Sequence, residues 1–370
     1  MLKWGSGVVA EIVRQTEQTQ IVRIVNSEKE SLAINYLDFQ PELAVGQRVV
    51  TNKTATHLKL GTGGYDFIIS PFVSQNEINY TVNHHKASLG HIMKLKYTPY
   101  QFSVESCEEQ GSAFHDLFRE PKTLAGLPVL VGELHSMLPI LVALIRGLEL
   151  KNSTKAKKIA YIMTDGGALP IAISEHVRKL KSLGWLGFTI TFGQSFGGDL
   201  EAINIYTALI AAKQICNADL VIVTMGPGIV GTGTLLGHSG IEQGVITNAV
   251  KILDGLPISL VRASLADQRV RHHGISHHTL TSLGLISLVE TIIPYPANLP
   301  KEHPDLYQQL NKHFAKKHQL IQQEVDMDEV KRILNSYPLP ITTMGRGLNE
   351  DALFFEFVAS SAYLISDILK

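Results

Sequence analysis

The residues best suited to chemistry lie in five loops, each directly after a short apolar run. These loops are rich in Gly, Ser, Thr and Asp, and they cover residues 132–136, 164–168, 193–199, 226–234 and 263–267. An ordinary connection between a strand and a helix needs only a short turn. In a parallel sheet such loops emerge along one edge, where ligands bind. The pattern therefore predicts one ligand site built from all five loops.

The second loop carries the strongest candidate for catalysis. Asp165 follows an apolar run and precedes Gly166 and Gly167, which leave room for a ligand beside the carboxylate. A carboxylate in this place can act as a general base, a metal ligand or a ribose contact. In the third loop, Asp199 is a further catalytic candidate or a helix cap, which is the commonest use of Asp before a helix. The same loops offer ligand contacts at Gly166, Gly167, Gln194, Ser195, Gly197 and Gly198.

The fourth loop is the most glycine-rich. Its backbone N–H groups and two threonine hydroxyls could hold a phosphate or a carboxylate near a helix N-terminus. The spacing matches neither GxGxxG followed by a helix nor GxxxxGK[ST], so the Rossmann dinucleotide and P-loop motifs are excluded. The alternative is a glycine-rich turn that only permits close packing. The predicted ligand contacts are Gly226, Gly228, Gly231, Thr232, Gly233 and Thr234.

Residues 269–278, RVRHHGISHH, combine two arginines with two histidine pairs. Arg269 and Arg271 are predicted to clamp an oxyanion, because guanidinium groups bind such groups in a fixed fork. Histidines titrate near neutral pH and bind metals, but no standard spacing such as HExxH is present, so a polar lid or a subunit contact is the alternative. The catalytic candidates here are His272 and His277. The candidate ligands of a divalent metal are Asp165, His135, His273 and His278, with His238 and Asp267 as further partners.

The fold that positions these loops is predicted from the change in hydrophobic period near residue 127. Apolar runs of strand length then alternate with helical stretches, which is typical of repeated βα units. We expect a Rossmann-like, three-layer α/β domain over residues 127–370, with helices over 170–183, 199–215 and 239–253. A capping box is expected from Ser239 to Glu242. Residues 1–100 predict a β-rich barrel or sandwich, and 101–126 a connecting segment.

The last 70 residues are predicted to be helical apart from 338–342. The final helix carries a wide apolar face that includes Phe354, Phe357 and Ile365. Such a face must be covered. It packs on the sheet or on a second subunit, which would make the protein a homo-oligomer.

The composition narrows the class of protein. Thirty-three Lys and Arg against 34 Asp and Glu give a net charge of -1, so no basic field for nucleic acid is present. The most apolar run, 127–147, contains Glu133, His135 and Pro139, which disfavours a membrane span. Two cysteines form no disulfide framework, and the first residues lack an export signal. We therefore expect a cytoplasmic protein.

Several glycine-containing strings occur along nearly the whole chain. They are residues 61–65 (GTGGY), 90–94 (GHIMK), 163–170 (MTDGGALP), 193–202 (GQSFGGDLEA), 226–234 (GPGIVGTGT) and 274–278 (GISHH). These strings resemble a bacterial family catalogued as domain of unknown function 3866. The resemblance implies a bacterial, cytoplasmic protein and supplies no catalytic residues.

Three functions fit these residues. The first is an enzyme that binds a phosphorylated or nucleotide-like small molecule, with Asp165 as acid, base or metal ligand. The second is a metal-dependent hydrolase in which one of the histidines joins Asp165, and metal analysis separates it from the first. The third is a non-catalytic sensor that binds the same small anionic ligand without turning it over.

Overall fold

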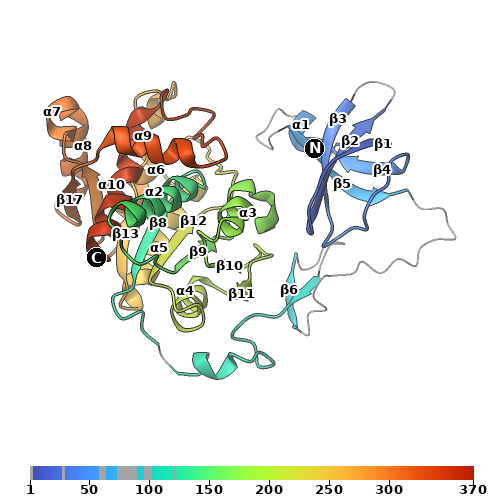
Figure 1. The fold of residues 1–370 in the computed structure, drawn as a ribbon, viewed down its shortest axis with the longest axis horizontal. Coiled ribbons are helices and arrows are strands. Elements are labelled where there is room, and N and C mark those ends of the chain that lie inside the picture. The colour runs from blue at the N-terminus through green and yellow to red at the C-terminus, as the bar shows by residue number, and fades with distance from the viewer. Residues whose placement is uncertain (1–2, 27–29, 58–63, 73–89, 96–101, 121) are drawn as a thin grey trace. The chain divides into compact units, whose positions relative to one another are not determined.

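The computed structural model describes residues 3–26, 30–57, 64–72, 90–95, 102–120 and 122–370. Residues 61–63 of the GTGGY string lie outside them. The chain forms two compact units, Met1–Leu89 with Lys96–Ser103 and Gly90–Leu95 with Val104–Lys370. Figure 1 labels the helices and strands within each unit.

The first unit is a closed barrel of five strands. Its order is β1-β2-β3-β5-β4, and only the β3–β5 pair is parallel. Alternate side chains point inwards, where Val9, Val22, Ile24 and Val49 form the core. The predicted barrel or sandwich is therefore a barrel. Its elements are β1 (Trp4–Gln15), β2 (Thr19–Val25), β3 (Glu30–Tyr36), β4 (Arg48–Asn52), α1 (Thr54–His57) and β5 (Tyr65–Pro71); β6 (Ile92–Lys94) and β7 (Phe102–Val104) follow along the chain.

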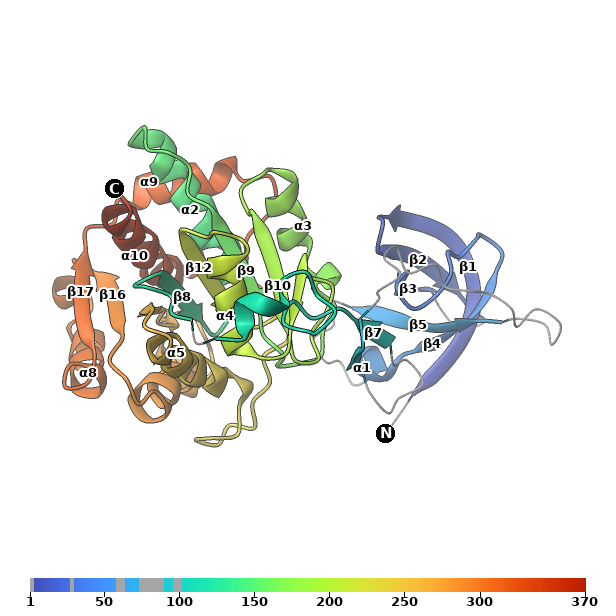
Figure 2. The ribbon, with the colours of Figure 1, turned by 90° about the horizontal axis from the view of Figure 1, so that it is seen from below.

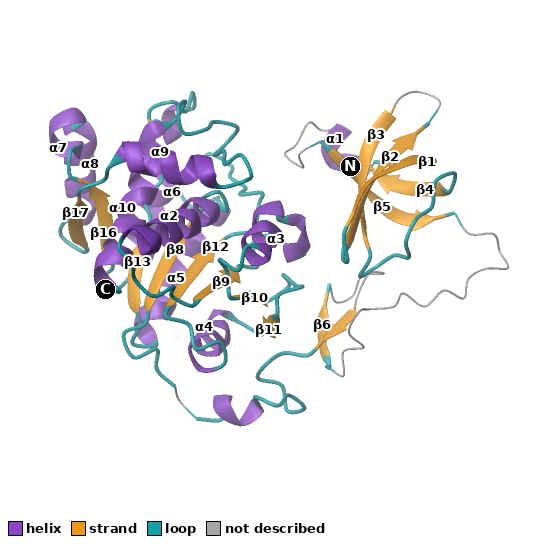
Figure 3. Ribbon diagram, viewed as in Figure 1, coloured by secondary structure: helices purple, strands orange, loops and turns teal. Residues whose placement is uncertain are grey.

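The second unit contains an eight-stranded sheet in which all neighbouring strands are parallel (Figure 3). Its order is β11-β10-β9-β12-β8-β13-β16-β17. The strands are β8 (Pro128–Gly132), β9 (Ile159–Met163), β10 (Phe188–Phe192), β11 (Leu200–Ala202), β12 (Leu220–Thr224), β13 (Leu256–Ser259), β16 (Ile292–Pro296) and β17 (Gln319–Gln323). The predicted α/β fold of βα repeats is confirmed.

Helices cover both faces of this sheet (Figure 2). In β12, Leu220 and Ile222 face α2, α3, α9 and α10, whereas Val221 and Val223 face α4 and α5. Because strands are buried on both faces, they read as continuous apolar runs. The helices are α2 (Met137–Lys151), α3 (Glu175–Ser182), α4 (Ile205–Gln214), α5 (Glu242–Ile252), α6 (His277–Thr281), α7 (Leu299–Glu302), α8 (Pro304–Phe314), α9 (Met327–Ser336) and α10 (Ala352–Ile368), and a short ribbon pairs β14 (Ala263–Ser264) with β15 (Gly274–Ile275).

The apolar face of α10 is covered within the chain. Phe354 and Val358 pack in the core shared with α2, and Phe357 packs in the core beside β16 and α8. The structure therefore supports the first of the two alternatives, in which this face packs on the sheet and not on a second subunit. The prediction of an all-helical region after residue 300 is wrong at β17, because this edge strand is mostly polar and gives little apolar signal.

Three predicted helix starts are also wrong. Residues 171–173 form a 3-10 turn, and α3 begins at Glu175 with Ser174 as its cap. Residues 200–202 form the short strand β11, and α4 is capped by Asn204. A 3-10 turn also precedes α5, whose Glu242 carboxylate bonds to Thr164 in place of closing a capping box. In the last two cases a tertiary contact uses the polar residue that the local pattern assigned to a cap: Asp199 bonds to Thr189, and Glu242 bonds to Thr164.

Within the described residues, no helix combines the length and the apolar character needed to cross a bilayer.

Candidate functional site

The connections that follow the central strands diverge at the carboxyl ends of these strands. The chain leaves β8 towards α2 on one face and leaves β12 towards α5 on the other, although β8 and β12 are neighbours. β9, on the other side of β12, also leads to the α2 face through α3. Loops that diverge in this way open a crevice at the strand ends, where open α/β sheets bind ligands.

Asp165 lies at the end of β9 and faces the loop after β10. Its Oδ1 accepts hydrogen bonds from the backbone N–H groups of Gln194 at 2.7 Å and Ser195 at 3.0 Å. The residue is half-buried. Burial raises the pKa of Asp165, although these two hydrogen bonds and the charge of Lys94 oppose the shift. The structure thus places a carboxylate of raised basicity at the carboxyl end of β9.

Glu242, the first residue of α5, adds a second carboxylate beside Asp165. Its Oε2 accepts a hydrogen bond of 2.5 Å from the hydroxyl of Thr164. Burial raises the pKa of Glu242, and the negative charge of Asp165 raises it further. A Cβ on Gly166 would lie 2.7 Å from the Met225 Cε, so the end of the Met225 side chain would have to shift, and 3.5 Å from the Glu242 Oε2. Sequence reasoning missed Glu242 as a site residue because its spacing matched a capping box.

A buried lysine fixes the loop that binds Asp165. The Nζ of Lys94 donates to the carbonyls of Gly193 at 2.7 Å and Ser195 at 2.8 Å, and it lies 3.1 Å from the Glu201 Oε2. The side chain of Gln194 accepts from the Leu95 N–H, and the Ser195 hydroxyl donates to the Thr164 carbonyl. The polar groups of Gln194 and Ser195 therefore hold the loop in place. Nothing in the sequence pointed to Lys94, which is far from this loop along the chain.

The rest of the third loop turns back along the sheet. Gly197 donates its N–H to Glu201, and Gly198 donates to the Thr191 hydroxyl. The Asp199 carboxylate accepts from the N–H and hydroxyl of Thr189, both at 2.8 Å, and it pairs with Lys181. Although burial opposes the shift, these partners lower the pKa of Asp199. Since Thr189 is the second residue of β10, Asp199 lies near the amino end of that strand, away from Asp165.

The glycine-rich loop folds back on itself. Gly228 and Gly233 have φ values of 107° and 78°, which favour glycine. The Thr232 hydroxyl contacts the Thr234 hydroxyl and donates to the Gly237 carbonyl, while the Gly237 N–H donates to Thr234. Both predicted anion-binding hydroxyls are thus used inside the loop. Residues 231–236 are exposed, whereas the preceding Gly226 is buried at the end of β12.

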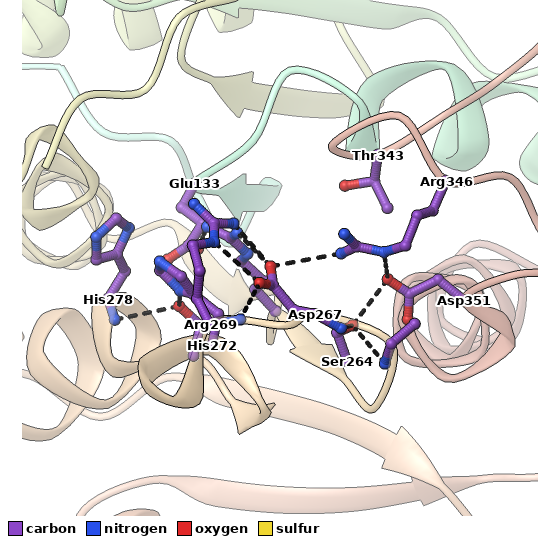
Figure 4. A network of polar contacts seen from close by, with 12 residues as sticks. Glu133, Ser264, Asp267, Arg269, His272, His278, Thr343, Arg346 and Asp351 are labelled. Atoms are coloured by element: carbon purple, nitrogen blue, oxygen red, sulfur yellow. Dashed lines mark hydrogen bonds and ion pairs between the residues drawn. The ribbon is translucent and has the colours of Figure 1, made fainter.

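The arginine and histidine segment starts in a network of buried charges (Figure 4). Arg269 forms a two-point ion pair with Asp267, at 2.9 and 2.7 Å, and Arg346 joins Asp267 to Asp351. The hydrogen bonds from Arg269 lower the pKa of Asp267. Arg271 is exposed, and within the described residues it has no ion pair. Of the two predicted clamps, Arg269 is paired with the buried Asp267, and Arg271 faces solvent.

Arg262 and Glu133 form a second ion pair of this network, in the protein interior. The Arg262 Nη1 lies 3.3 Å from the Glu133 Oε1, and its Nη2 lies 3.7 Å from the Asp267 Oδ2. The Thr279 hydroxyl donates to the other Glu133 oxygen at 3.2 Å. Glu133 and Arg262 follow the neighbouring strands β8 and β13. Sequence reasoning missed this pair, because only the sheet order brings the two residues together.

Four histidines gather beside the glycine-rich loop. The rings of His272, His277 and His278 lie 4.4 to 5.1 Å apart between centroids, and His238 stacks on His278 at 3.9 Å. A Cβ on Gly231 would lie 3.1 Å from the His278 Nε2, so the loop backbone contacts the cluster directly. The glycine-rich loop and the histidine segment therefore lie side by side.

Two predicted metal ligands lie outside the histidine cluster. The ring nitrogens of His135 contact the hydroxyls of Ser174 at 2.6 Å and Tyr161 at 3.2 Å, which occupies both. His273 is exposed. The histidines whose nitrogens converge in the described part of the chain are His238, His277 and His278. The sequence predicted His278 as a candidate metal ligand, His238 as a further partner and His277 as a catalytic candidate.

This combination of a small β-barrel with a parallel α/β sheet defines a protein of two units. Residues 32–362 match the family described as "Protein of unknown function (DUF3866)", and the chain belongs to this family. No curated protein matches the sequence.

Proposed function

We propose that this protein is an enzyme that acts on a small phosphorylated or nucleotide-like molecule in the crevice at the ends of β8, β9 and β12. The observation that carries the proposal is the carboxylate pair of Asp165 and Glu242. Both groups are half-buried, and burial raises the pKa of each. Groups with perturbed pKa values in a crevice are typical of acid–base catalysis.

The surroundings divide the roles within the pair. Asp165 accepts two backbone hydrogen bonds, which favour its charged form, so it is the general base. Burial and the neighbouring charge of Asp165 raise the pKa of Glu242, although the hydrogen bond from the Thr164 hydroxyl opposes the shift, so Glu242 is the general acid. A proton can pass between this pair and a substrate while only one of the two carboxylates is charged.

The anionic character of the substrate is supported by Arg271 and by the glycine-rich loop. Arg271 is exposed, and its charge lowers the pKa of His277 after the larger effect of burial, so the guanidinium lies close to the histidine cluster. Gly231 of the loop contacts the same cluster. An exposed cation beside a flexible backbone is suited to a phosphate or carboxylate group.

The test compares isosteric variants at the pair. Asp165→Asn and Glu242→Gln are expected to lower turnover by about 10²- to 10⁴-fold, the usual contribution of general acid–base catalysis, with little change in unfolding free energy. Substrates would be screened by thermal shift against nucleotides, sugar phosphates and divalent metals, where a ligand at about a hundred times its Kd adds about 2.7 kcal/mol of stability. Turnover of each stabilising ligand would then be measured.

The matched control is Asp254→Asn. Asp254 is exposed and follows α5 at the opposite edge of the sheet, so turnover should equal that of the wild type. Equal turnover in Asp165→Asn, Glu242→Gln and wild type would refute the proposal. A ligand that stabilises the protein and is never turned over would instead indicate a sensor.

A metal-dependent hydrolase is the second candidate, favoured by the histidine cluster beside the same crevice. The group of converging metal-binding atoms consists of three histidines and does not include Asp165. In a metal-dependent hydrolase Asp165 would therefore serve as a base and not as a ligand. Turnover that is lost on chelation and restored by Zn²⁺ would favour this candidate over a metal-free reaction.

A further inference from the structure

We infer that His238, His277 and His278 form a binding site for one divalent transition metal ion of the Zn²⁺ class. Each residue offers one ring nitrogen, and these nitrogens lie within 4.8 Å of one another. His238 comes from the end of the glycine-rich loop, and the other two residues open α6. This site goes beyond the proposed acid–base chemistry, which requires no metal.

The first argument is that these nitrogens lack other partners. Both ring nitrogens of His238, Nε2 of His277 and Nδ1 of His278 are shielded from solvent without a hydrogen bond to any described residue. His238 and His278 are only 7% and 4% exposed. Polar atoms buried in this way are costly, so they normally have a partner. A metal ion between the rings would be a partner for one nitrogen of each of the three histidines.

The second argument is the placement of the rings. The centroids of His238 and His278 lie 3.9 Å apart, and those of His277 and His278 lie 4.4 Å apart.

The rings need only a small rearrangement to bind an ion. The planes of His238 and His278 are 6° from parallel, and the in-plane lone pairs of two stacked rings cannot meet at one ion. One ring must turn about χ2, a torsion with a broad energy profile. With Zn–N bonds of about 2.1 Å, tetrahedral nitrogens lie about 3.4 Å apart, so the nitrogens approach one another by roughly 1.4 Å at most.

The backbone around the cluster leaves space for this rotation. Gly231 and Gly240 lie against the rings at positions where a Cβ would come within 3.1 Å of the His278 Nε2 and 3.2 Å of the His238 Nδ1. Larger residues at either position would fill the space next to the nitrogens. His272 packs against His277 and His278 from the other side, with its Nδ1 held by the Ser276 hydroxyl at 2.9 Å.

The set of donors indicates the class of metal and its role. Imidazole nitrogens suit Zn²⁺, Cu²⁺ and Ni²⁺, whereas Mg²⁺ and Ca²⁺ prefer oxygen. Three neutral ligands do not reduce the charge of the ion. They also leave one coordination position open, as in catalytic zinc sites. Because Arg262 and Arg271 add positive charge near His277, an anionic oxygen of a substrate is the favoured fourth ligand.

The experiment measures metal binding by the full-length protein, independently of turnover. Protein stripped with a chelator would be titrated with Co²⁺, whose absorption spectrum reports tetrahedral coordination, and with Zn²⁺ in competition with a chromophoric chelator. We expect one ion per chain. His277→Gln and His238→Asn should weaken Zn²⁺ binding by at least about tenfold, while circular dichroism shows that both variants fold.

Three further variants decide which residues form the site. His313→Gln, at an exposed histidine in α8, should bind Zn²⁺ as the wild type does. Equal binding by wild type, His277→Gln and His238→Asn would overturn the assignment, as would an absence of Zn²⁺ binding by the wild type. A tenfold loss in Asp165→Asn or His273→Gln would also overturn the three-histidine set. Apart from a loss of Zn²⁺ binding in Asp165→Asn, which would make Asp165 a metal ligand, these outcomes do not bear on the acid–base role of Asp165 and Glu242.

Discussion

Replacing Arg262 with methionine is expected to lower the free energy of unfolding by about 3 to 5 kcal/mol, the usual cost of removing one partner from a buried ion pair. The side chains of Arg262 and Glu133 are 4% and 0% exposed. Without Arg262, the Glu133 carboxylate keeps only the hydroxyl of Thr279 and must be protonated or hydrated. Urea denaturation at neutral pH would measure the loss.

A double-mutant cycle separates the ion pair from the packing of Arg262. Arg262→Met combined with Glu133→Gln removes both charges, so it should be more stable than Arg262→Met alone. The matched control is Arg332→Met, which breaks the contact of an arginine with 69% side-chain exposure to Glu329 and should cost less than about 1 kcal/mol. If Arg262→Met cost no more than this control, the buried pair would not stabilise the fold as described.

Mild acid is expected to destabilise the protein through histidines that are buried in the neutral form. Burial lowers the pKa of His135 to about 4. Burial also lowers the pKa of His318, whose Nδ1 accepts from the Thr291 N–H and whose Nε2 donates to the Leu283 carbonyl. In an unfolded chain histidine titrates near pH 6.5. The folded state therefore binds fewer protons below about pH 6.5, and stability falls as the pH is lowered towards about 4.

His135 contributes on the order of 2 kcal/mol to this loss of unfolding free energy, after allowance for its partial exposure. Urea denaturation at about pH 7.5 and about pH 4.5 would measure the difference in unfolding free energy. His135→Gln keeps an acceptor for Ser174 and removes the titration, so its difference should be smaller than that of the wild type. His313→Gln is the exposed control and should retain the full difference. An unchanged difference in His135→Gln would contradict the assignment.

The sequence predicted the framework of the α/β unit because the strands are buried on both faces. Runs such as 220–224 are apolar at every position, and their alternation with helical periods indicates a parallel sheet. Local patterns failed where polar residues make tertiary contacts. Asp199 bonds to Thr189, and Glu242 bonds to Thr164, although each had the position of a helix cap. The polar edge strand β17 gave no apolar signal and was assigned to a helix.

For the candidate site, the sequence by itself determined which loops carry reactive groups: glycines and polar residues stand out after apolar strands, and Asp165 and His278 are recognisable there. Only the tertiary structure decided which groups meet. The strand order places Glu133 beside Arg262, the start of α5 brings Glu242 to Asp165, and the return of the glycine-rich loop sets His238 against His278. The physical reason is that residue types and local periods are properties of short segments. Partnerships between side chains depend instead on how distant strands pair and on which face each connection crosses.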